Sequence, residues 1–173
     1  MAGQYGLGLE RTVNRLAPAH PQWAQAFVEE TQRIRTVVGA DALSIEHYGS
    51  TSVPGLSAKP IIDLLIGVAA LDVADRHAPG MLSLGYDDAG SGGIEGHRIF
   101  GNGLARTHLA HFVVFEGPEW RATLRFRDLL RADAGLRTAY EALKTQLVTD
   151  HPSDRAAYTA GKTAFVLDAL GRA

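Results

Sequence analysis

Residues that could bind an anion or a metal ion are concentrated between Gly49 and Asp63. Gly49 and Ser50 form a turn signal, and the backbone N–H groups of such a turn can hold an anion. Lys59 adds a positive charge, and Asp63 is the one charged residue in the otherwise apolar run 61–68. A carboxylate in a covered strand costs several kcal/mol unless a cation, a metal ion or a hydrogen-bond donor meets it. We therefore expect Asp63 to have such a partner.

Two interpretations of this stretch remain open from the residues alone. In the first, Gly49, Ser50, Thr51 and Lys59 hold phosphate oxygens, while Asp63 holds a divalent cation, Mg²⁺ or Mn²⁺. In the second, the glycines and serines are only turn residues, and Asp63 pairs with one of three basic side chains. These are Lys59, Arg98 and Arg106.

The composition is typical of one soluble domain. A chain of 173 residues can bury a sizeable single core. The net charge of −2 argues against binding of nucleic acid through overall charge attraction. There is no cysteine, no secretory signal and no apolar stretch long enough to cross a membrane. We expect a flexible lead-in over 1–20, one domain over 21–173 and a cytoplasmic location.

The hydrophobic periodicity predicts helices and strands in alternation. The elements expected in the first half are a helix over 21–38, strands over 43–47 and 60–68, a helix over 73–84 capped by Asp72, and a strand over 86–88. The first two strands are expected to lie side by side, so that the Gly49–Ser50 turn and Asp63 converge. An Asp63 near the carboxyl end of its strand would face the mouth of the sheet, where ligands of open sheets collect.

Two further strands, over 97–100 and 105–115, are expected to form a hairpin. Side chains alternate along a strand, so His108 and His111 fall on opposite faces unless a bulge intervenes. We favour His111 as the neighbour of Asp63 because it begins the apolar end of its strand. A histidine that only fills the core is the alternative.

The remaining residues predict C-terminal helices. In the helix expected over 118–132, Arg125 or Arg127 could reach a bound triphosphate. Alternatively, these arginines form a solvated basic face in which Asp128 is an ion-pair partner. Lys144 is expected on the outer side of a further helix. Lys162 falls in a last helix, expected over 153–170 with Ser153 as its cap, where it could meet phosphate or Asp63, or lie on the surface.

The run from His47 to Leu56, with Ala58–Pro60 and Ile62–Asp63 after it, resembles the signature of the GrpB-like family. The resemblance extends from about Trp23 to about Phe165. It includes Arg106-Thr107-His108, His111, Trp120 and Phe126-Arg127-Asp128-Leu129-Leu130-Arg131. That family belongs to the nucleotidyltransferase-fold, polymerase-beta-like superfamily and is also found fused to dephospho-CoA kinases. The resemblance implies an α+β, α/β-like fold: a small, mixed, twisted sheet flanked by helices.

The superfamily pattern joins a Gly-Ser turn to a strand with two carboxylates two residues apart and a third on a neighbouring strand. Gly49, Ser50 and Asp63 match this pattern, but Leu65 stands at the second carboxylate position. Two-metal nucleotidyl transfer depends on carboxylates that clamp both ions. The departure at Leu65 implies either a different metal shell, with His111 or His108 helping, or binding without catalysis.

Three functions are therefore expected to compete. The first is a nucleotidyltransferase-like protein that binds a nucleoside triphosphate or related phosphorylated small molecule with a divalent metal and transfers a nucleotidyl group to a hydroxyl. The second is a non-catalytic module for a nucleotide or a coenzyme-A-related ligand. The third is metal-dependent hydrolysis by Asp63, His108 and His111. Supporting roles are expected for His47, His108 and Asp128.

Overall fold

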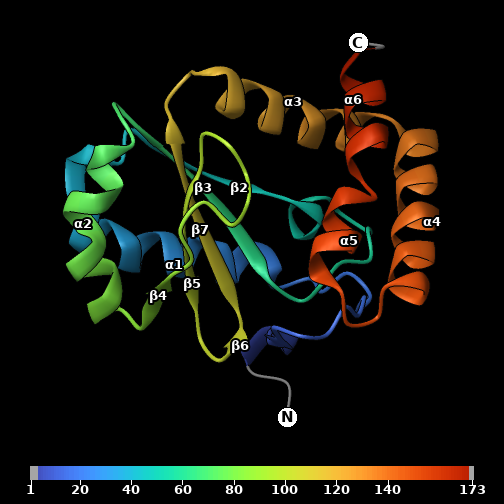
Figure 1. The fold of residues 1–173 in the computed structure, drawn as a ribbon, viewed down its shortest axis with the longest axis horizontal. Helices are drawn as coiled ribbons and strands as arrows, with labels where there is room; N and C mark the ends of the chain where they lie inside the picture. The colour runs from blue at the N-terminus through green and yellow to red at the C-terminus, as the bar shows by residue number, and fades with distance from the viewer. Residues whose placement is uncertain (1–3, 172–173) are drawn as a thin grey trace.

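The centre of the computed structural model, which describes residues 4–171, is a five-stranded sheet (Figure 1). Its strands lie in the order β2–β3–β7–β5–β4. They are Ser44–Tyr48 (β2), Ile62–Val68 (β3), Tyr86–Asp88 (β4), Arg98–Asn102 (β5) and His108–Val114 (β7). β3 and β7 are parallel, and the other three neighbouring pairs are antiparallel. The predicted mixed sheet of the α+β class is confirmed.

Asp63 lies at the start of β3, beside Tyr48 of β2 and Leu109 of β7. It therefore lies at the amino end of its strand, opposite to the end at which ligands of open parallel sheets usually collect. The antiparallel pairing of β2 with β3 explains this placement. It brings the last residue of β2, and the turn that follows, to the beginning of β3.

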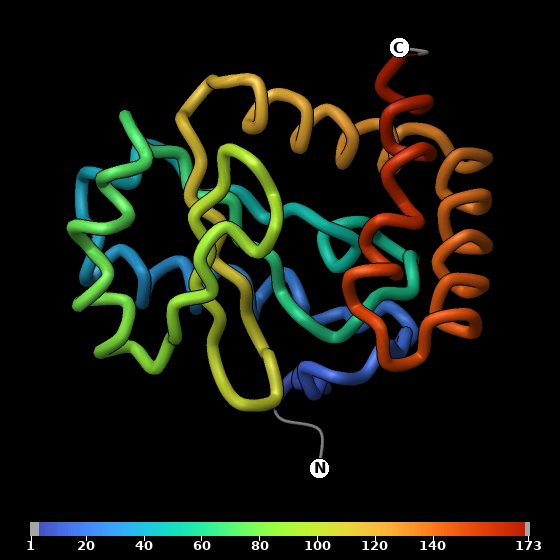
Figure 2. The backbone as a smooth tube through the Cα atoms, viewed as in Figure 1, coloured from blue at the N-terminus to red at the C-terminus, as the bar shows by residue number. Residues whose placement is uncertain are grey.

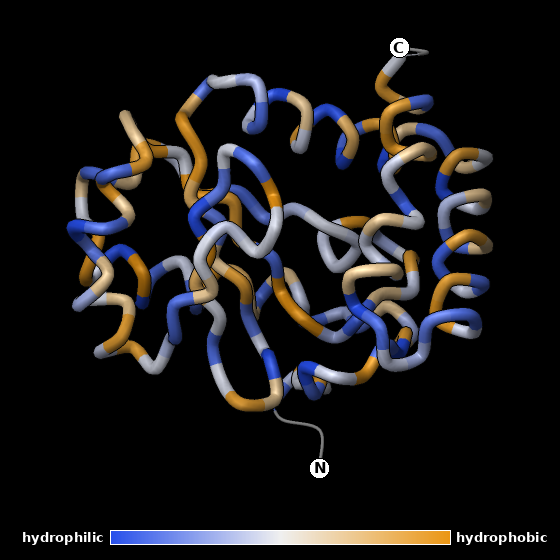
Figure 3. Tube along the Cα trace, in the orientation of Figure 1, coloured by the Kyte–Doolittle hydropathy of each residue, from blue (hydrophilic) through white to orange (hydrophobic). Residues whose placement is uncertain are grey.

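Helices cover the two faces of the sheet unequally. Their bounds are Trp23–Val38 (α1), Asp72–Ser83 (α2), Pro118–Ala132 (α3), Ala134–Asp150 (α4), Arg155–Ala160 (α5) and Thr163–Gly171 (α6). α1 and α2 pack on one face through the main apolar core, which includes Leu64, Ile66 and Phe112. Trp120 of α3 packs on the other face against Leu65. Figure 3 shows how apolar residues run through the central strands.

The helices α4, α5 and α6 stand beside the sheet rather than on it (Figures 1 and 2). A second apolar cluster joins them to α3 and to the loop after β2. It contains Val53, Leu56, Leu130 and Tyr140, with Phe165 packed against it. This cluster fixes the loop between the sheet and the C-terminal helices, and so fixes the segment that carries Lys59.

Three expected elements differ in detail. The last helix is broken at 161–162 into α5 and α6, and Asp154 rather than Ser153 caps α5 by accepting from the Ala157 N–H at 2.9 Å. Asp72 is the first residue of α2 rather than its cap. The long strand expected over 105–115 is divided into β6 (Ala105–Arg106) and β7.

The segment expected to be a flexible lead-in is packed against the domain over 4–20, whereas 1–3 lie outside the described residues. Leu7 and Leu9 are each 3% exposed. β1 (Leu9–Glu10) pairs with β6. Buried leucines and strand pairing hold this segment in place, although its glycines suggested mobility. Within 4–171, no helix combines the length and apolar character needed to cross a membrane.

Candidate functional site

The turn after β2 packs directly against Asp63. Gly49 has a φ of +70°, and a Cβ at this position would clash with Asp63 Oδ2 and lie 3.2 Å from Cγ. A short 3₁₀ helix, Ser50–Ser52 (η3), follows, and the Ser52 hydroxyl donates to the Gly49 carbonyl at 2.7 Å. The predicted convergence of the turn with Asp63 is confirmed. Glycine is required here because the carboxylate occupies the space that a side chain would need.

His47 supports the turn from the buried side. Its Nε2 lies 3.0 Å from Thr51 Oγ1, and its ring stacks on Phe27 with centroids 4.8 Å apart. Burial lowers the pKa of His47 to about 4, and the positive charges of Arg131 and Arg127 act in the same direction. His47 is therefore neutral near pH 7, and the Thr51 hydroxyl is engaged with it.

Neither arginine offered as a partner for Asp63 is paired with it. Arg98 forms an ion pair with Asp88 at 2.6 Å, and Arg106 forms one with Asp87 at 2.6 Å. Both arginines are held at the β4 edge of the sheet, because Asp87 and Asp88 are residues of β4. That part of the alternative interpretation is wrong.

Asp63 keeps 26% of its side-chain surface exposed. Burial of the remainder raises its pKa to about 7, although the charges of Lys162, Lys59 and Arg155 each act to lower it. These three cations come from the loop before β3 and from the region of α5. The carboxylate is thus accessible and lies within a field of positive charge.

Lys59 and Lys162 lie at the same tyrosine ring. The Lys59 ammonium group is 3.7 Å from the centroid of the Tyr158 ring, and that of Lys162 is 4.7 Å from it. Lys59 also donates to Asn14 Oδ1 at 2.6 Å. Such cation–π contacts hold both ammonium groups without neutralising their charge.

Lys144 reaches the same region from α4, and its predicted exposure is wrong. The side chain is 1% exposed, and its Nζ donates to Ser50 Oγ at 3.1 Å and to the Ser57 carbonyl oxygen. The reason is helical spacing, since Tyr140, Lys144 and Leu147 share the buried side of α4. The buried lysine is accommodated because the turn after β2 offers it two oxygen acceptors.

We call Lys59, Lys144, Lys162, Arg155 and Ser50 the lysine site. The chain contains only three lysines, and all three are in this site. Burial lowers the pKa of Lys59 and of Lys144 to about 7 each, and the charge of Lys162 contributes to both shifts. Burial also lowers the pKa of Lys162 and of Arg155. Three basic groups, Lys59, Lys162 and Arg155, thus act on Asp63, and Lys144 joins them through Ser50 and the charge of Lys162.

The two histidines of β7 lie on opposite faces, as the alternation predicted. His111 shares the face of Asp63, and its Nε2 is 3.8 Å from Asp63 Oδ1. His108 lies on the α1 side, where its Nδ1 is 3.0 Å from Thr107 Oγ1 and the charge of Glu30 acts on it. The regular register of β3 with β7 contains no bulge, so His108 does not reach Asp63.

The site does not fit the carboxylate clamp of a two-metal nucleotidyltransferase. Leu65, at the second carboxylate position, is fully buried against Val113 and Trp120. Leu109 occupies the position on β7 beside Asp63. Among the described residues, no three His, Cys, Asp or Glu side chains come together as a metal site. Beside the lysine site, Asp63 Oδ1 and His111 Nε2 lie 3.8 Å apart and are atoms suited to a metal ion.

The arginines predicted for phosphate binding lie on α3. Arg127 donates to Glu46 Oε2 at 2.8 Å and to the His47 carbonyl at 3.0 Å, and it forms an ion pair with Asp128. The Arg127 guanidinium therefore connects α3 to β2. Its ion pair with Asp128 is the one expected in the alternative interpretation. Asp128 is a partner of Arg127 in this contact.

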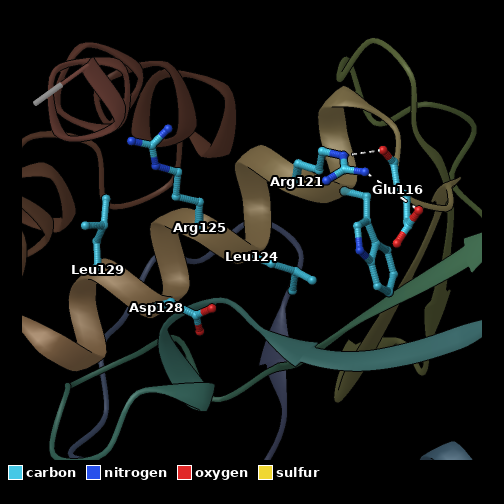
Figure 4. Close-up of a pocket in the computed structure, with 7 residues that line it drawn as sticks. Glu116, Arg121, Leu124, Arg125, Asp128 and Leu129 are labelled. Atoms are coloured by element: carbon cyan, nitrogen blue, oxygen red, sulfur yellow. Dashed lines mark hydrogen bonds and ion pairs between the residues drawn. The ribbon is translucent and has the colours of Figure 1, made fainter. Parts of the chain in front are cut away.

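Arg125 lines a separate, shallow hollow of about 590 Å³ along α3. Figure 4 shows Arg121 turned towards Glu116 in this hollow, and Arg125 and Asp128 on opposite sides of the helix. None of the residues of the lysine site lines the hollow, so it is distinct from the surroundings of Asp63.

The sequence interpretation missed Lys144 and Arg155. A usable signal was present, because lysine is rare in this chain while arginine is common. Lys144 also falls four residues after Tyr140, on the apolar side of α4. For Arg155, the first residue of α5, the sequence offered no comparable signal.

The mixed five-stranded sheet and its flanking helices define an α+β protein with a nucleotidyltransferase-like fold. The fold resembles the structure of Cid1 in complex with its short product ApU, with a TM-score of 0.52 and 14% identity over 83% of this chain and 48% of that chain. At this identity the likeness concerns the fold. The chain belongs to the GrpB family, whose match, GrpB protein, covers residues 14–172.

Individual relatives agree with this assignment. The crystal structure of conserved protein GrpB from Enterococcus faecalis has a TM-score of 0.81 and 33% identity, covering 91% of this chain and 98% of that chain. Glutamate-rich protein GrpB of Alkalihalophilus pseudofirmus is 32% identical over 95% of this chain and 98% of its own length.

Other relatives are longer. UPF0157 protein YqkA of Bacillus subtilis is 38% identical over 84% of this chain, a match that spans 43% of that protein. A dephospho-CoA kinase of Mycobacterium tuberculosis is 29% identical over 95% of this chain and 47% of its own length. The chain thus spans less than half of these two relatives.

Proposed function

We propose that this protein binds the phosphate groups of a nucleotide, or of a related phosphorylated small molecule, at the lysine site. One observation carries the proposal: all three lysines of the chain, together with Arg155, surround the Gly49–Ser50 turn and Asp63. Four basic groups outnumber the two carboxylates that act on them, Asp63 and Glu141, so positive charge is in excess. A bound anion would relieve the mutual repulsion of these groups, which is part of why the pKa values of Lys59 and Lys144 fall to about 7.

The local chemistry suits phosphate. An ammonium group binds phosphate as a point charge with freely directed hydrogen bonds. Ser50 Oγ accepts from Lys144 and is also hydrogen-bonded to the Tyr140 side chain, so it holds the ammonium group of Lys144 at the turn. Partial burial strengthens each of these interactions because the local dielectric is lower than that of water.

The fold and the relatives support a nucleotide in particular. The structure of Cid1 was solved with ApU, a product that contains two nucleosides, and the M. tuberculosis relative is a dephospho-CoA kinase. Either observation is compatible with a phosphorylated ligand that carries an adenosine or uridine. A coenzyme-A-related ligand is therefore included among the candidates.

Nucleotidyl transfer to a hydroxyl is the second candidate function. The observation in its favour is the partly exposed Asp63 beside the lysine site, at the strand position that bears the first carboxylate in the superfamily. Leu65 counts against it, because the second carboxylate is replaced by a core residue. Release of pyrophosphate in the presence of an acceptor hydroxyl distinguishes transfer from binding alone.

Isothermal titration in EDTA tests the binding proposal with ATP, CTP, GTP, UTP, coenzyme A and inorganic tripolyphosphate. We expect at least one to bind, and Lys59→Met and Lys144→Met each to weaken binding about 10-fold, since a charged hydrogen bond contributes roughly 1.5–3 kcal/mol. Arg76→Met is the matched control, because Arg76 is 62% exposed in α2 and loses the same charge. The proposal fails if none of the six binds, or if the control loses as much affinity as the lysine variants.

A further inference from the structure

The imidazole of His111 has one nitrogen for which the protein provides no hydrogen-bond partner. Its Nε2 is buried without a partner and lies 3.8 Å from Asp63 Oδ1, too far for a hydrogen bond. His111 is 5% exposed, and its ring is held edge-on by Tyr48 at a centroid distance of 5.3 Å. A buried polar atom of this kind is costly unless a ligand completes it.

The other nitrogen of His111 is fixed by a second histidine. His111 Nδ1 lies 3.2 Å from His97 Nδ1, so one of the two nitrogens must donate and the other accept. His97 Nε2 lies 3.8 Å from the carboxylate of Glu119 in α3. In the tautomer in which His97 carries its proton on Nε2, beside Glu119, His97 Nδ1 accepts and His111 Nδ1 donates. His111 Nε2 then carries a lone pair, which a cation held by Asp63 would use.

We propose that Asp63 Oδ1 and His111 Nε2 are the two protein ligands of one divalent transition-metal ion, with His97 and Glu119 setting the tautomer of His111. In that tautomer the Asp63 carboxylate and the lone pair of His111 Nε2, 3.8 Å apart, repel unless a proton or a metal ion lies between them, so a bound metal ion would stabilise the arrangement. Ligand histidines commonly donate their second ring N–H to a further group that ends in a carboxylate, which is the arrangement here.

The separation is suited to a metal ion. Two donors bound at about 2.1 Å with a tetrahedral angle between them lie roughly 3.4 Å apart, a few tenths of an ångström from the observed spacing. The imidazole favours Zn²⁺ or Co²⁺ over Mg²⁺ and Mn²⁺, which prefer oxygen ligands. With only two protein donors, the other coordination positions remain for water or for phosphate oxygens held at the lysine site.

The proposed metal site adds a cation to the proposed phosphate-binding function and rests on it. The metal site is nevertheless tested without a nucleotide. Co²⁺ is titrated into the metal-free protein and followed by its visible absorption, alone and then with inorganic tripolyphosphate. We expect one ion per chain in at least one condition, with the spectrum of a nitrogen-ligated ion. Asp63→Asn and His111→Gln are expected to abolish binding, and Glu119→Gln to weaken it about 10-fold. Circular dichroism confirms that each variant is folded.

His108→Gln is the matched control, since this histidine belongs to the same strand and lies on the opposite face. It should leave Co²⁺ binding unchanged. The proposal is overturned if the wild type binds no Co²⁺ in either condition, or if folded His111→Gln binds it as well as the wild type. Should Glu119→Gln also cause no change, the tautomer argument is wrong. Tripolyphosphate binding is measured separately in EDTA, where it depends on the lysines and not on a metal ion. The phosphate-binding proposal and the metal-binding proposal can therefore fail independently of each other.

Discussion

Lys144 Nζ and Ser50 Oγ lie 3.1 Å apart, although 94 positions separate them in the chain. Through this contact α4 places a buried ammonium group on the turn that packs against Asp63. Lys59 and Lys162 complete the arrangement from the loop before β3 and from the junction of α5 and α6. The candidate site is therefore shared between the sheet and the C-terminal helices.

Replacing Gly49 with alanine should destabilise the protein by about 3 kcal/mol, because the substitution combines a strained φ with a clash against Asp63. Gly55→Ala is the control. Gly55 has a φ of +78° but nothing within 4 Å of its added Cβ, so about 1 kcal/mol is expected. Urea denaturation of both variants measures the difference. Equal losses would show that the carboxylate does not restrict the turn.

Anion binding should weaken as the pH rises from 6 to 8. The pKa values of Lys59 and Lys144 are about 7, so both lysines are charged at the lower pH and largely neutral at the higher one. Asp63, whose pKa is also about 7, gains negative charge over the same range and acts in the same direction. We expect an affinity loss of about 10-fold or more.

Sulfate is the suitable probe for this titration because its own charge is constant over the range. Lys144→Met should bind sulfate more weakly at pH 6 and show a shallower pH profile. Asp63→Asn removes the contribution of the carboxylate and should retain the part due to the lysines. A flat wild-type profile would contradict the assignment of the lysines to anion binding.

Acid should destabilise the fold through His47. Its pKa is about 4 in the folded protein, where the ring is buried on Phe27, against an unfolded value near 6.5. Below pH 6.5 the unfolded chain binds a proton that the folded chain does not, so stability falls until the pH reaches about 4. The loss from this residue is about 3 kcal/mol. Denaturation curves between pH 4 and 7 should show a smaller slope for His47→Gln than for the wild type.

Introducing the missing carboxylate should disrupt the core instead of creating a two-metal site. Leu65 is fully buried against Val113 and Trp120. Leu65→Asp places a charge there and should cost about 4 kcal/mol or more. Leu65→Asn, of the same size without the charge, should cost less. A stable Leu65→Asp variant that binds two metal ions would show that the fold still accepts the superfamily arrangement.

Much of the region around Asp63 could be predicted from local pattern. The apolar run 61–68 indicated a covered strand, and the Gly49–Ser50 turn indicated a close approach of backbone, both of which the structure confirms. The alternation in β7 placed His108 and His111 on opposite faces, and the apolar run after His111 favoured it as the neighbour of Asp63, as the structure confirms. These features depend on the periodicity of two residues in a strand and on the conformational freedom of glycine, so they are recorded in short stretches of sequence.

The relation between distant elements could not be predicted in this way. Lys144 was expected to be exposed because charged side chains are seldom buried, and its acceptors lie on a loop far away in the chain. Likewise, the ion pair of Arg127 with Glu46 depends on how α3 crosses β2. No property of either residue alone distinguishes a phosphate ligand from a structural tie.

The amino-acid sequence by itself determined the family, the α+β class and the presence of a lone acid in a covered strand beside a glycine turn, because each follows from residue types at short spacing. Only the tertiary structure decided that Asp63 lies at the amino end of β3, that three lysines gather around Asp63 and the turn that packs against it, and that His111 has an unpartnered nitrogen near Asp63. The physical reason is that these features arise from long-range packing between the sheet and α3–α6, which balances burial, charge and hydrogen bonding over the whole domain.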